Sequence, residues 1–326
     1  MRIAKAQPLL GVEGAKPPAL LLAPVRILFI TATRLGDAVL STGLLAWLLA
    51  RHPNARVTVA CGPVAAGVFA RMPGLERVLV VDKRRLDLHW LLLWAQVAGT
   101  VWDLVVDLRG SALSLVLLAR RRAIMRGGRR PGHRLTHIAG ALGIAERLVP
   151  VAWTGPADRA LAAGLLPEGG PVIGFGPTAN WPGKIWPADC FVALAHALEA
   201  GLPGMRLAVF GGPGEAERVT AAPLLAAWPG AIDLVGRLTL PEAAACLARC
   251  LVFVGNDSGL MHLSAAAGAA TLGLFGPTPA GEYAPAGRMA AFIEADGPPG
   301  AAPMSALGVD GVLEAALALL RQDGAL

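Results

Sequence analysis

Residues 251–262 read LVFVGNDSGLMH, an apolar run followed by a Gly-rich turn and by residues suited to a helix. The run Leu251–Val254 is short and rich in valine, which predicts a buried strand. Small residues at 255–259 predict a turn that leaves backbone N–H groups open at the start of the next helix. In doubly wound sheets such turns follow the carboxyl ends of strands, where ligands bind. The stretch therefore predicts an α/β sheet with a binding site at that edge.

The same alternation of short β-branched runs and longer amphipathic segments extends through the chain from Val25. It predicts parallel sheets covered by helices on both faces. The expected strands are Val25–Thr31, Arg56–Cys61, Val78–Val81 and Leu104–Leu108 in the first half, and Pro171–Gly174, Arg206–Phe210, Leu251–Val254 and Thr271–Phe275 in the second. The expected helices include Gly36–Arg51, a segment ending near Met72, Pro187–Ala200, a segment from Glu215, and Val309–Arg321.

The alternation of strands and helices is interrupted between residues 150 and 170, where Gly- and Pro-rich stretches lie on either side of a short segment expected to be helical. A chain of 326 residues exceeds the usual size of one core, so we read this region as a linker. We expect an N-terminal extension over 1–24 and two Rossmann-like domains over 25–155 and 156–326. The fold class is then α/β, with two parallel-sheet domains facing a central cleft.

Composition argues for a folded chain, with 55% apolar and 16% charged residues. The mean hydropathy is +0.56, yet no stretch offers about 20 continuous apolar residues for a membrane span. The short apolar segment at 19–23 follows two prolines and does not resemble a signal peptide. We therefore expect a cytoplasmic protein, at most peripheral at the inner membrane. The four cysteines are scattered among apolar neighbours, which favours buried thiols.

Positive charge is concentrated in the first half of a chain whose net charge is +6. Any single arginine is best read as part of a solvated surface, but seven within 15 residues predict an anionic partner. Candidate partners are a phosphorylated glycolipid, an anionic membrane and nucleic acid, and no nucleic-acid-binding motif accompanies the cluster. Its members are Arg120, Arg121, Arg122, Arg126, Arg129, Arg130 and Arg134.

The turn after the first expected strand, residues 31–37, lacks the three spaced glycines of a dinucleotide site. This argues against an NAD or FAD enzyme. Asp37 at the start of the next helix suits the helix dipole, as a capping or first-turn acid. At the carboxyl edge of the sheet, Asp37 is also a candidate general base. The residues alone leave both roles open.

A second group of candidates lies in the other half of the chain. Residues 180–187 read NWPGKIWP, a stiff loop in which Lys184 stands between two tryptophans and is suited to bind an anion. Ser258 and the turn before it form a helix start suited to the same anion, and His262 follows one turn later. Together they favour a diphosphate. Glu215 after a Gly-rich turn is suited to ribose hydroxyls. The alternatives are a solvated lysine, a core histidine, and capping or first-turn roles for Asp257 and Glu215.

No metal site is expected, because there is no Asp-x-Asp pair and the six histidines form no ligand cluster. We also expect no cofactor.

Taken together, these segments resemble glycosyltransferase family 9, the ADP-heptose:lipopolysaccharide heptosyltransferases and their relatives. The order and spacing of the motifs carry the resemblance from residue 25 onward. Thr178 stands where the family often has glycine, and Leu260 where it often has proline. The matching segments are 26–30 with 34–37, 181–187 (WPGKIWP), 210–215 (FGGPGE), 234–240 (LVGRLTL), 254–259 (VGNDSG) with His262, and 275–278 (FGPT).

The resemblance implies a GT-B fold and an inverting, metal-independent transfer of heptose from ADP-heptose to a lipopolysaccharide core acceptor. Asp37 would take the place of the general base and Lys184 that of the phosphate-binding lysine. The arginine cluster would face the anionic glycolipid acceptor or the membrane. The residues expected at the donor are Thr178, Asn180, Lys184, Glu215, Asp257, Ser258, Gly259 and His262.

Other functions remain open on the same architecture. A related transferase could use another nucleotide sugar or acceptor. A sugar-nucleotide epimerase would also bind a nucleotide diphosphate between two domains, and would act without an acceptor. A non-catalytic sugar-nucleotide-binding protein would need neither Asp37 nor Lys184.

Overall fold

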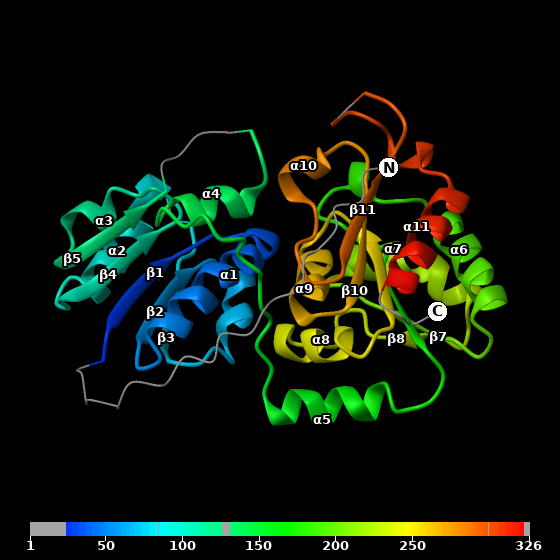
Figure 1. The fold of residues 1–326 in the computed structure, drawn as a ribbon, viewed down its shortest axis with the longest axis horizontal. Helices are drawn as coiled ribbons and strands as arrows, with labels where there is room; N and C mark the ends of the chain where they lie inside the picture. Colours follow the sequence, from blue (N-terminus) through cyan, green and yellow to red (C-terminus); the bar gives the residue numbers. More distant parts are fainter. Residues whose placement is uncertain (1–23, 84, 126–130, 299, 323–326) are drawn as a thin grey trace.

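The computed structural model describes residues 24–83, 85–125, 131–298 and 300–322. The extension expected at 1–24 lies outside this range except for its last residue. Within the described chain there are two sheets, and neighbouring strands in each are parallel (Figure 1). The expected α/β class with two parallel sheets is confirmed. The boundary between residues 155 and 156 stays a prediction.

The first sheet has the strand order β3-β2-β1-β4-β5. The order in which successive strands are added to the sheet reverses between β1 and β4, and loops at such a switch point open a crevice for ligands. Apolar residues of α1 and α4 pack on one face, and those of α2 and α3 pack on the other. The elements are β1 (Arg26–Ile30), α1 (Leu35–Arg51), β2 (Arg56–Cys61), η1 (Pro63–Phe69), β3 (Leu75–Val80), η2 (Arg85–Asp87), α2 (Leu88–Val97), β4 (Trp102–Asp107), α3 (Leu113–Val116), β5 (Ala119–Ile124) and α4 (Arg134–Gly140).

The second sheet has the order β11-β10-β9-β6-β7-β8, with its switch point between β6 and β9. Helices α6, α7 and α11 cover one face, while α8 and α9 cover the face toward the first sheet. The elements are α5 (Pro156–Leu165), β6 (Val172–Gly176), η3 (Pro182–Lys184), α6 (Ala188–Gly201), β7 (Arg206–Val209), α7 (Glu215–Ala227), β8 (Ile232–Asp233), α8 (Leu240–Leu247), β9 (Val252–Asn256), α9 (Gly259–Ala267), β10 (Ala270–Phe275), α10 (Ala280–Tyr283), β11 (Ala290–Glu294), η4 (Met304–Ala306) and α11 (Val309–Gln322).

Three local predictions were wrong or incomplete. The segment ending near Met72 is the 3₁₀ helix η1, in which Gly67 disfavours an α-helix. Helix α6 begins at Ala188, because Pro187 has ψ of 139° and is the extended residue before it. Strands β5, β8 and β11 were not expected. All three lie at sheet edges, where exposed and charged side chains are tolerated and the period of a buried strand is lost.

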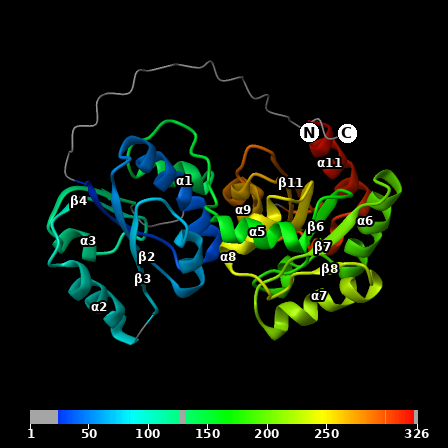
Figure 2. The same cartoon turned by 90° about the horizontal axis from the view of Figure 1, so that it is seen from below.

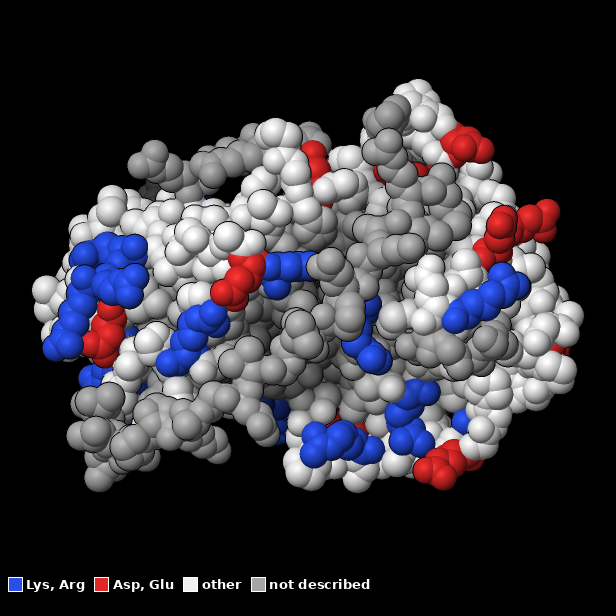
Figure 3. Space-filling view, in the orientation of Figure 1, with Lys and Arg blue, Asp and Glu red and all other residues white. Residues whose placement is uncertain are grey.

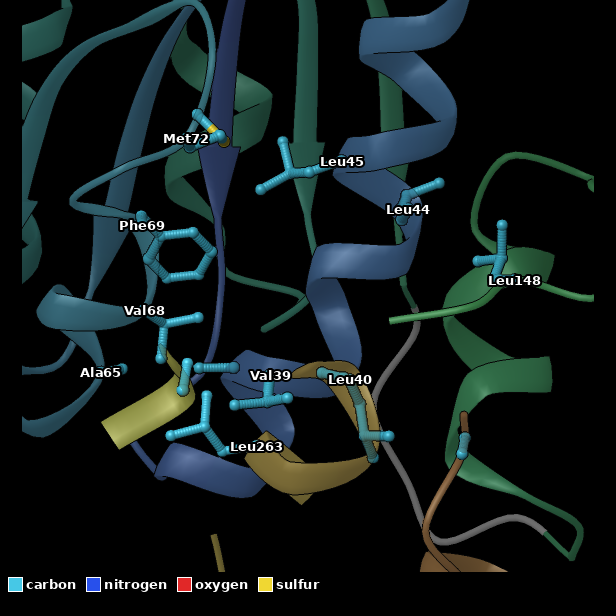
Figure 4. Close-up of a cluster of buried hydrophobic side chains, with 14 of the residues drawn as sticks. Val39, Leu40, Leu44, Leu45, Ala65, Val68, Phe69, Met72, Leu148 and Leu263 are labelled. Carbon is cyan, nitrogen blue, oxygen red and sulfur yellow. The ribbon is translucent and has the colours of Figure 1, made fainter. Parts of the chain in front are cut away.

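The two halves meet where α1 crosses α9. A Cβ atom built on Gly36 would lie 2.8 Å from Cδ2 of His262, and one built on Gly259 would lie 2.6 Å from Cδ2 of Leu35. The backbones approach this closely because both positions lack a side chain. Leu263 of α9 lies close to Val39 of α1 in one apolar cluster (Figure 4). The same cluster includes α8, on which α5 packs as it crosses between the halves (Figure 2).

The described cysteine thiols are unpaired, and Cys61, Cys246 and Cys250 are buried as expected. Burial raises the pKa of Cys61 to about 12 and that of Cys246 to about 11. These thiols are therefore apolar core groups at neutral pH. Within the residues described, every helix is too short or too polar to cross a membrane.

We expect Gly259→Ala to lower the free energy of unfolding by about 1–3 kcal/mol, because the methyl group overlaps Leu35. Gly164→Ala is the matched control, since Gly164 lies in α5 with no atom within 4 Å of its would-be Cβ. The control should leave stability unchanged or raise it by up to about 1 kcal/mol. Urea denaturation measures both, and a Gly259→Ala protein as stable as the wild type would contradict the close crossing.

Candidate functional site

The candidate site lies where the switch points of the two sheets come together. Asp37 stands in the first turn of α1, directly after β1, and Asp257 follows β9 and precedes α9. Because the starts of α1 and α9 are in contact, the carboxyl edges of both sheets supply side chains to one region. The candidate site residues come from both halves of the sequence, and the structure brings Asp37, Asp257 and His262 together.

Helix α9 begins with polar groups that lack partners inside the protein. Ser258 is its N-cap residue, in an extended conformation, so Asp257 is not the cap. In the described part of the chain, the buried Ser258 Oγ and the buried His262 Nδ1 accept or donate no hydrogen bond. Buried polar atoms are rarely left unpaired, and each one calls for a ligand, a water or a functional explanation. A helix N-terminus next to them is suited to an anion.

His262 is the most strongly perturbed group of this region. Its side chain is only 4% exposed, and burial lowers the pKa of the imidazole to about 4. The carboxylates of Asp257 and Asp37 act in the opposite direction and raise the pKa, but burial dominates. The ring is therefore neutral near pH 7. A neutral imidazole can both donate and accept one hydrogen bond, which suits a phosphate or hydroxyl ligand.

Lys184 forms an ion pair with Asp257, with 2.5 Å between Nζ and Oδ2. The same Asp257 oxygen accepts a hydrogen bond from Thr278 Oγ1 at 2.8 Å. Both partners of the ion pair are largely buried, so the lysine ammonium has little freedom. Lys184 thus lies beside the start of α9, as the expected anion site requires, and its charge is paired with Asp257.

The loop that carries Lys184 is held by Trp186. Its backbone N–H donates to Asn256 Oδ1 at 3.1 Å, and its indole N–H donates to Leu307 O at 2.9 Å. Asn256 in turn donates to Pro177 O at 2.9 Å, so this buried amide joins the ends of β6 and β9. The expectation that tryptophan and proline fix the lysine is confirmed for Trp186. The supporting roles of Asn256 and Thr278 were missed, although both lie in the quoted motifs.

Asp37 is paired with Arg134, with 3.1 Å between Oδ1 and Nε. Arg134 opens α4, directly after His133, which accepts a hydrogen bond from Leu135 N at 3.2 Å and contacts Ala284 O at 2.9 Å. Asp37 lies inside the first turn of α1, and Arg34 is the cap. Asp37 is therefore a first-turn helix acid, and its role as general base stays a prediction.

Tyr283 of α10 is a further group near Asp37 that the sequence analysis missed. Burial raises the pKa of its phenol, and the negative charge of Asp37 adds to the effect. Tyr283 is the single tyrosine of the chain, which was the only signal available.

The other expected donor residues lie at the same edge of the second sheet but make fewer contacts. Thr178 is buried after β6, and Asn180 is exposed in the following loop. Glu215 is exposed at the first residue of α7. The carboxylate that contacts the neighbouring Gly-rich turn is that of Glu217, which accepts from Gly212 N at 3.1 Å. A role for Glu215 in holding a nucleoside stays a prediction.

The arginine cluster does not form one patch in the described residues. Arg120, Arg121 and Arg122 lie on the edge strand β5, whereas Arg134 reaches Asp37. Arg126, Arg129 and Arg130 lie outside the described residues. Among the residues that are described, no group of three or more His, Cys, Asp and Glu side chains is arranged to hold a metal ion.

Residues 145–301 match the family described as glycosyltransferase family 9 (heptosyltransferase). The chain resembles glycosyltransferase family 9 over this segment. It is 37% identical over 114 residues to lipooligosaccharide heptosyltransferase 2 of Haemophilus influenzae, a match covering 33% of this chain and 32% of that protein. The chain thus spans about a third of the length of that relative.

A longer match is found with lipopolysaccharide heptosyltransferase 2 of Salmonella typhimurium. The two are 25% identical over 295 residues, which cover 78% of this chain and 83% of the relative. The solved structure of the Escherichia coli ADP-heptose lipopolysaccharide heptosyltransferase II superposes with a TM-score of 0.74 and 23% identity. That superposition covers 92% of this chain and all of the other, which confirms the expected GT-B fold.

We expect the imidazole of His262 to titrate with a midpoint near pH 4 in NMR spectra of the folded protein. An unfolded histidine takes up its proton near pH 6.5, so the unfolded state binds more protons between these values. The free energy of unfolding therefore decreases as pH falls from about 6.5 toward 4.

His262→Gln should remove this part of the pH dependence, and the same substitution of the exposed His196 should retain it. A titration midpoint of His262 near 6.5 would contradict its burial as an unpaired neutral group.

Proposed function

We propose that this chain is an inverting, metal-independent glycosyltransferase that moves a heptose from ADP-heptose to a lipopolysaccharide core acceptor. The observation that carries the proposal is the start of α9, where Lys184 lies beside the unpartnered Ser258 Oγ and His262 Nδ1. A diphosphate would satisfy all three groups together with the helix N-terminus. The names of the Haemophilus, Salmonella and E. coli relatives support the donor and the acceptor class.

In the proposed reaction, Asp37 takes the proton of an acceptor hydroxyl as that oxygen attacks the anomeric carbon of the donor sugar. The bond from that carbon to the β-phosphate oxygen breaks, and ADP leaves with the electron pair. A single displacement of this kind inverts the configuration at the anomeric carbon. Lys184 and the start of α9 offset the negative charge that grows on the departing diphosphate. These fixed charges supply what a metal ion supplies in other transferases, so turnover should persist in excess EDTA.

Arg134 is the member of the arginine cluster that reaches the proposed base. Its ion pair holds the Asp37 carboxylate in one orientation. An anionic group on the acceptor would lie close to Arg134 when its hydroxyl approaches Asp37. We therefore assign acceptor binding to the first sheet and donor binding to the second, at the cytoplasmic face of the membrane where a glycolipid acceptor is presented.

Asp37→Asn should lower kcat by about 10²–10⁴ and leave the Kd for ADP-heptose nearly unchanged, because the base acts on the acceptor. The assay is acceptor-dependent release of ADP, with a deacylated lipopolysaccharide core as the soluble acceptor. Asp310→Asn is the matched control, since Asp310 is also a first-turn helix acid but lies on α11. Turnover by Asp37→Asn equal to that of the control would remove Asp37 as base.

Release of ADP that is indifferent to the acceptor would favour the epimerase class instead. Binding without any release would favour the non-catalytic alternative.

Lys184→Met should raise the Kd for ADP about tenfold or more, because a buried charge-assisted hydrogen bond to phosphate is lost. Isothermal titration calorimetry measures the change. Lys83→Met, at an exposed lysine before α2, is the control and should bind as the wild type does. Equal affinities for the two variants would show that Lys184 does not contact the diphosphate.

A further inference from the structure

Helix α2 has an apolar outer face that no described residue covers. Its inner side chains, among them Leu93 and Val97, are buried on the first sheet. Its outer side chains are also large and apolar, and they are exposed at Leu88, Leu91, Leu92 and Trp94. A surface helix is normally polar on its outer face, and a helix that is apolar all round normally has something against both sides.

A second exposed apolar segment lies beside it. In and after α3, Leu113 and Leu117 are buried on the same face of the sheet as α2. Between and after them, Leu115, Val116 and Leu118 are exposed. Figures 1 and 2 place α2 and α3 near each other, at the end of the molecule remote from α11. We call these exposed residues of α2 and α3, with Leu118, the α2–α3 face.

Basic side chains border the α2–α3 face. Arg122 is in register with Val105, which is buried under α2 and α3, so Arg122 projects from this side of the sheet. Its guanidinium donates to the carbonyl oxygens of Ser114 and Leu117 at the α3 segment. Arg120 is two residues earlier on the same edge strand and therefore projects to the same side. Figure 3 shows Lys and Arg gathered at this end of the molecule, beside an uncharged area.

Further charges lie at the start of α2. Lys83 and Arg85 precede the helix and are exposed, and the guanidinium of Arg109 lies 4.8 Å from the ring centre of Trp90. Acidic groups are also present. Asp82 and Asp87 stand in the same loop, and Asp103 is paired with Arg120. The local balance is positive, in keeping with the net charge of +6.

We propose that the α2–α3 face docks on the surface of an anionic phospholipid membrane, with α2 and the α3 segment inserted among the lipid headgroups. Exposed Leu, Val and Trp side chains flanked by Lys and Arg match both parts of such a surface, its apolar interior and its negative headgroups. The inference extends the proposed function by naming the partner that presents the acceptor, but the docking itself does not depend on catalysis.

The test uses the full chain and vesicles that contain no acceptor. Vesicles with about a quarter phosphatidylglycerol are compared with neutral phosphatidylcholine vesicles in a flotation assay. The test variant is L91Q/L115Q/V116Q, at side chains that are 60%, 64% and 66% exposed. The control variant is L161Q/L165Q/V219Q, which replaces exposed apolar side chains of the other domain. None of these residues belongs to the candidate site.

We expect the wild type and the control to float with the anionic vesicles, and to float less at about 0.5 M salt than at about 0.05 M. The partition coefficient of L91Q/L115Q/V116Q should fall by about tenfold or more relative to the wild type, because three inserted apolar side chains are lost. Wild-type protein that does not float, or a test variant that floats as the control does, overturns the proposal. Wild-type protein that sediments as a dimer, with a monomeric test variant that still floats, also overturns it and assigns the face to a second copy.

Measurements of turnover distinguish a failure of the membrane-docking proposal from a failure of the proposed transferase activity. With the deacylated soluble acceptor the test variant should match the wild type, and with acceptor embedded in vesicles it should be slower. A wild type that floats but shows no turnover with either acceptor would refute the transferase and leave the docking surface in place.

Discussion

The crossing of α1 and α9 is the contact on which the arrangement of the site depends. Both helices begin there, so two positive helix ends face each other across the junction of the two halves. Gly36 and Gly259 allow the approach, and the acids Asp37 and Asp257 offset the positive ends. Two cations then pair with these acids, Arg134 with Asp37 and Lys184 with Asp257. The proposed base and the proposed phosphate site are thereby held against each other by the packing that joins the sheets.

His262 lies at the centre of this charge arrangement and is neutral because it is buried. Its neutrality matters, since a third cation beside two helix N-termini would need more negative charge than the two carboxylates supply. A bound diphosphate would change that balance, because it would bring negative charge to the starts of the helices and compete with Asp257 for Lys184. Donor binding and the pairing of the acids are therefore linked in the proposed mechanism.

The parts of the fold that could be predicted are those in which local sequence and tertiary packing agree. Buried strands such as β1, β2 and β9 carry continuous apolar runs, and the turns after them contain glycine. The strands and the binding edge of the sheet could therefore be predicted from the sequence. The edge strands β5, β8 and β11 gave no such signal, and β5 resembles an arginine cluster because Ala123 is its only buried residue. The family motifs placed Lys184 and Asp37 correctly at their sheet edges. The pairing of Arg134 with Asp37 depends on how α4 packs over a separation of 97 residues, which no local pattern encodes.

One apolar cluster contains side chains of α1, η1 and α4 from the first half and of α8 and α9 from the second. The two sheets therefore do not have fully separate interiors, although each has its own strands and its own switch point. An evolutionary exchange of one half for that of a distant relative would leave this common interior mismatched.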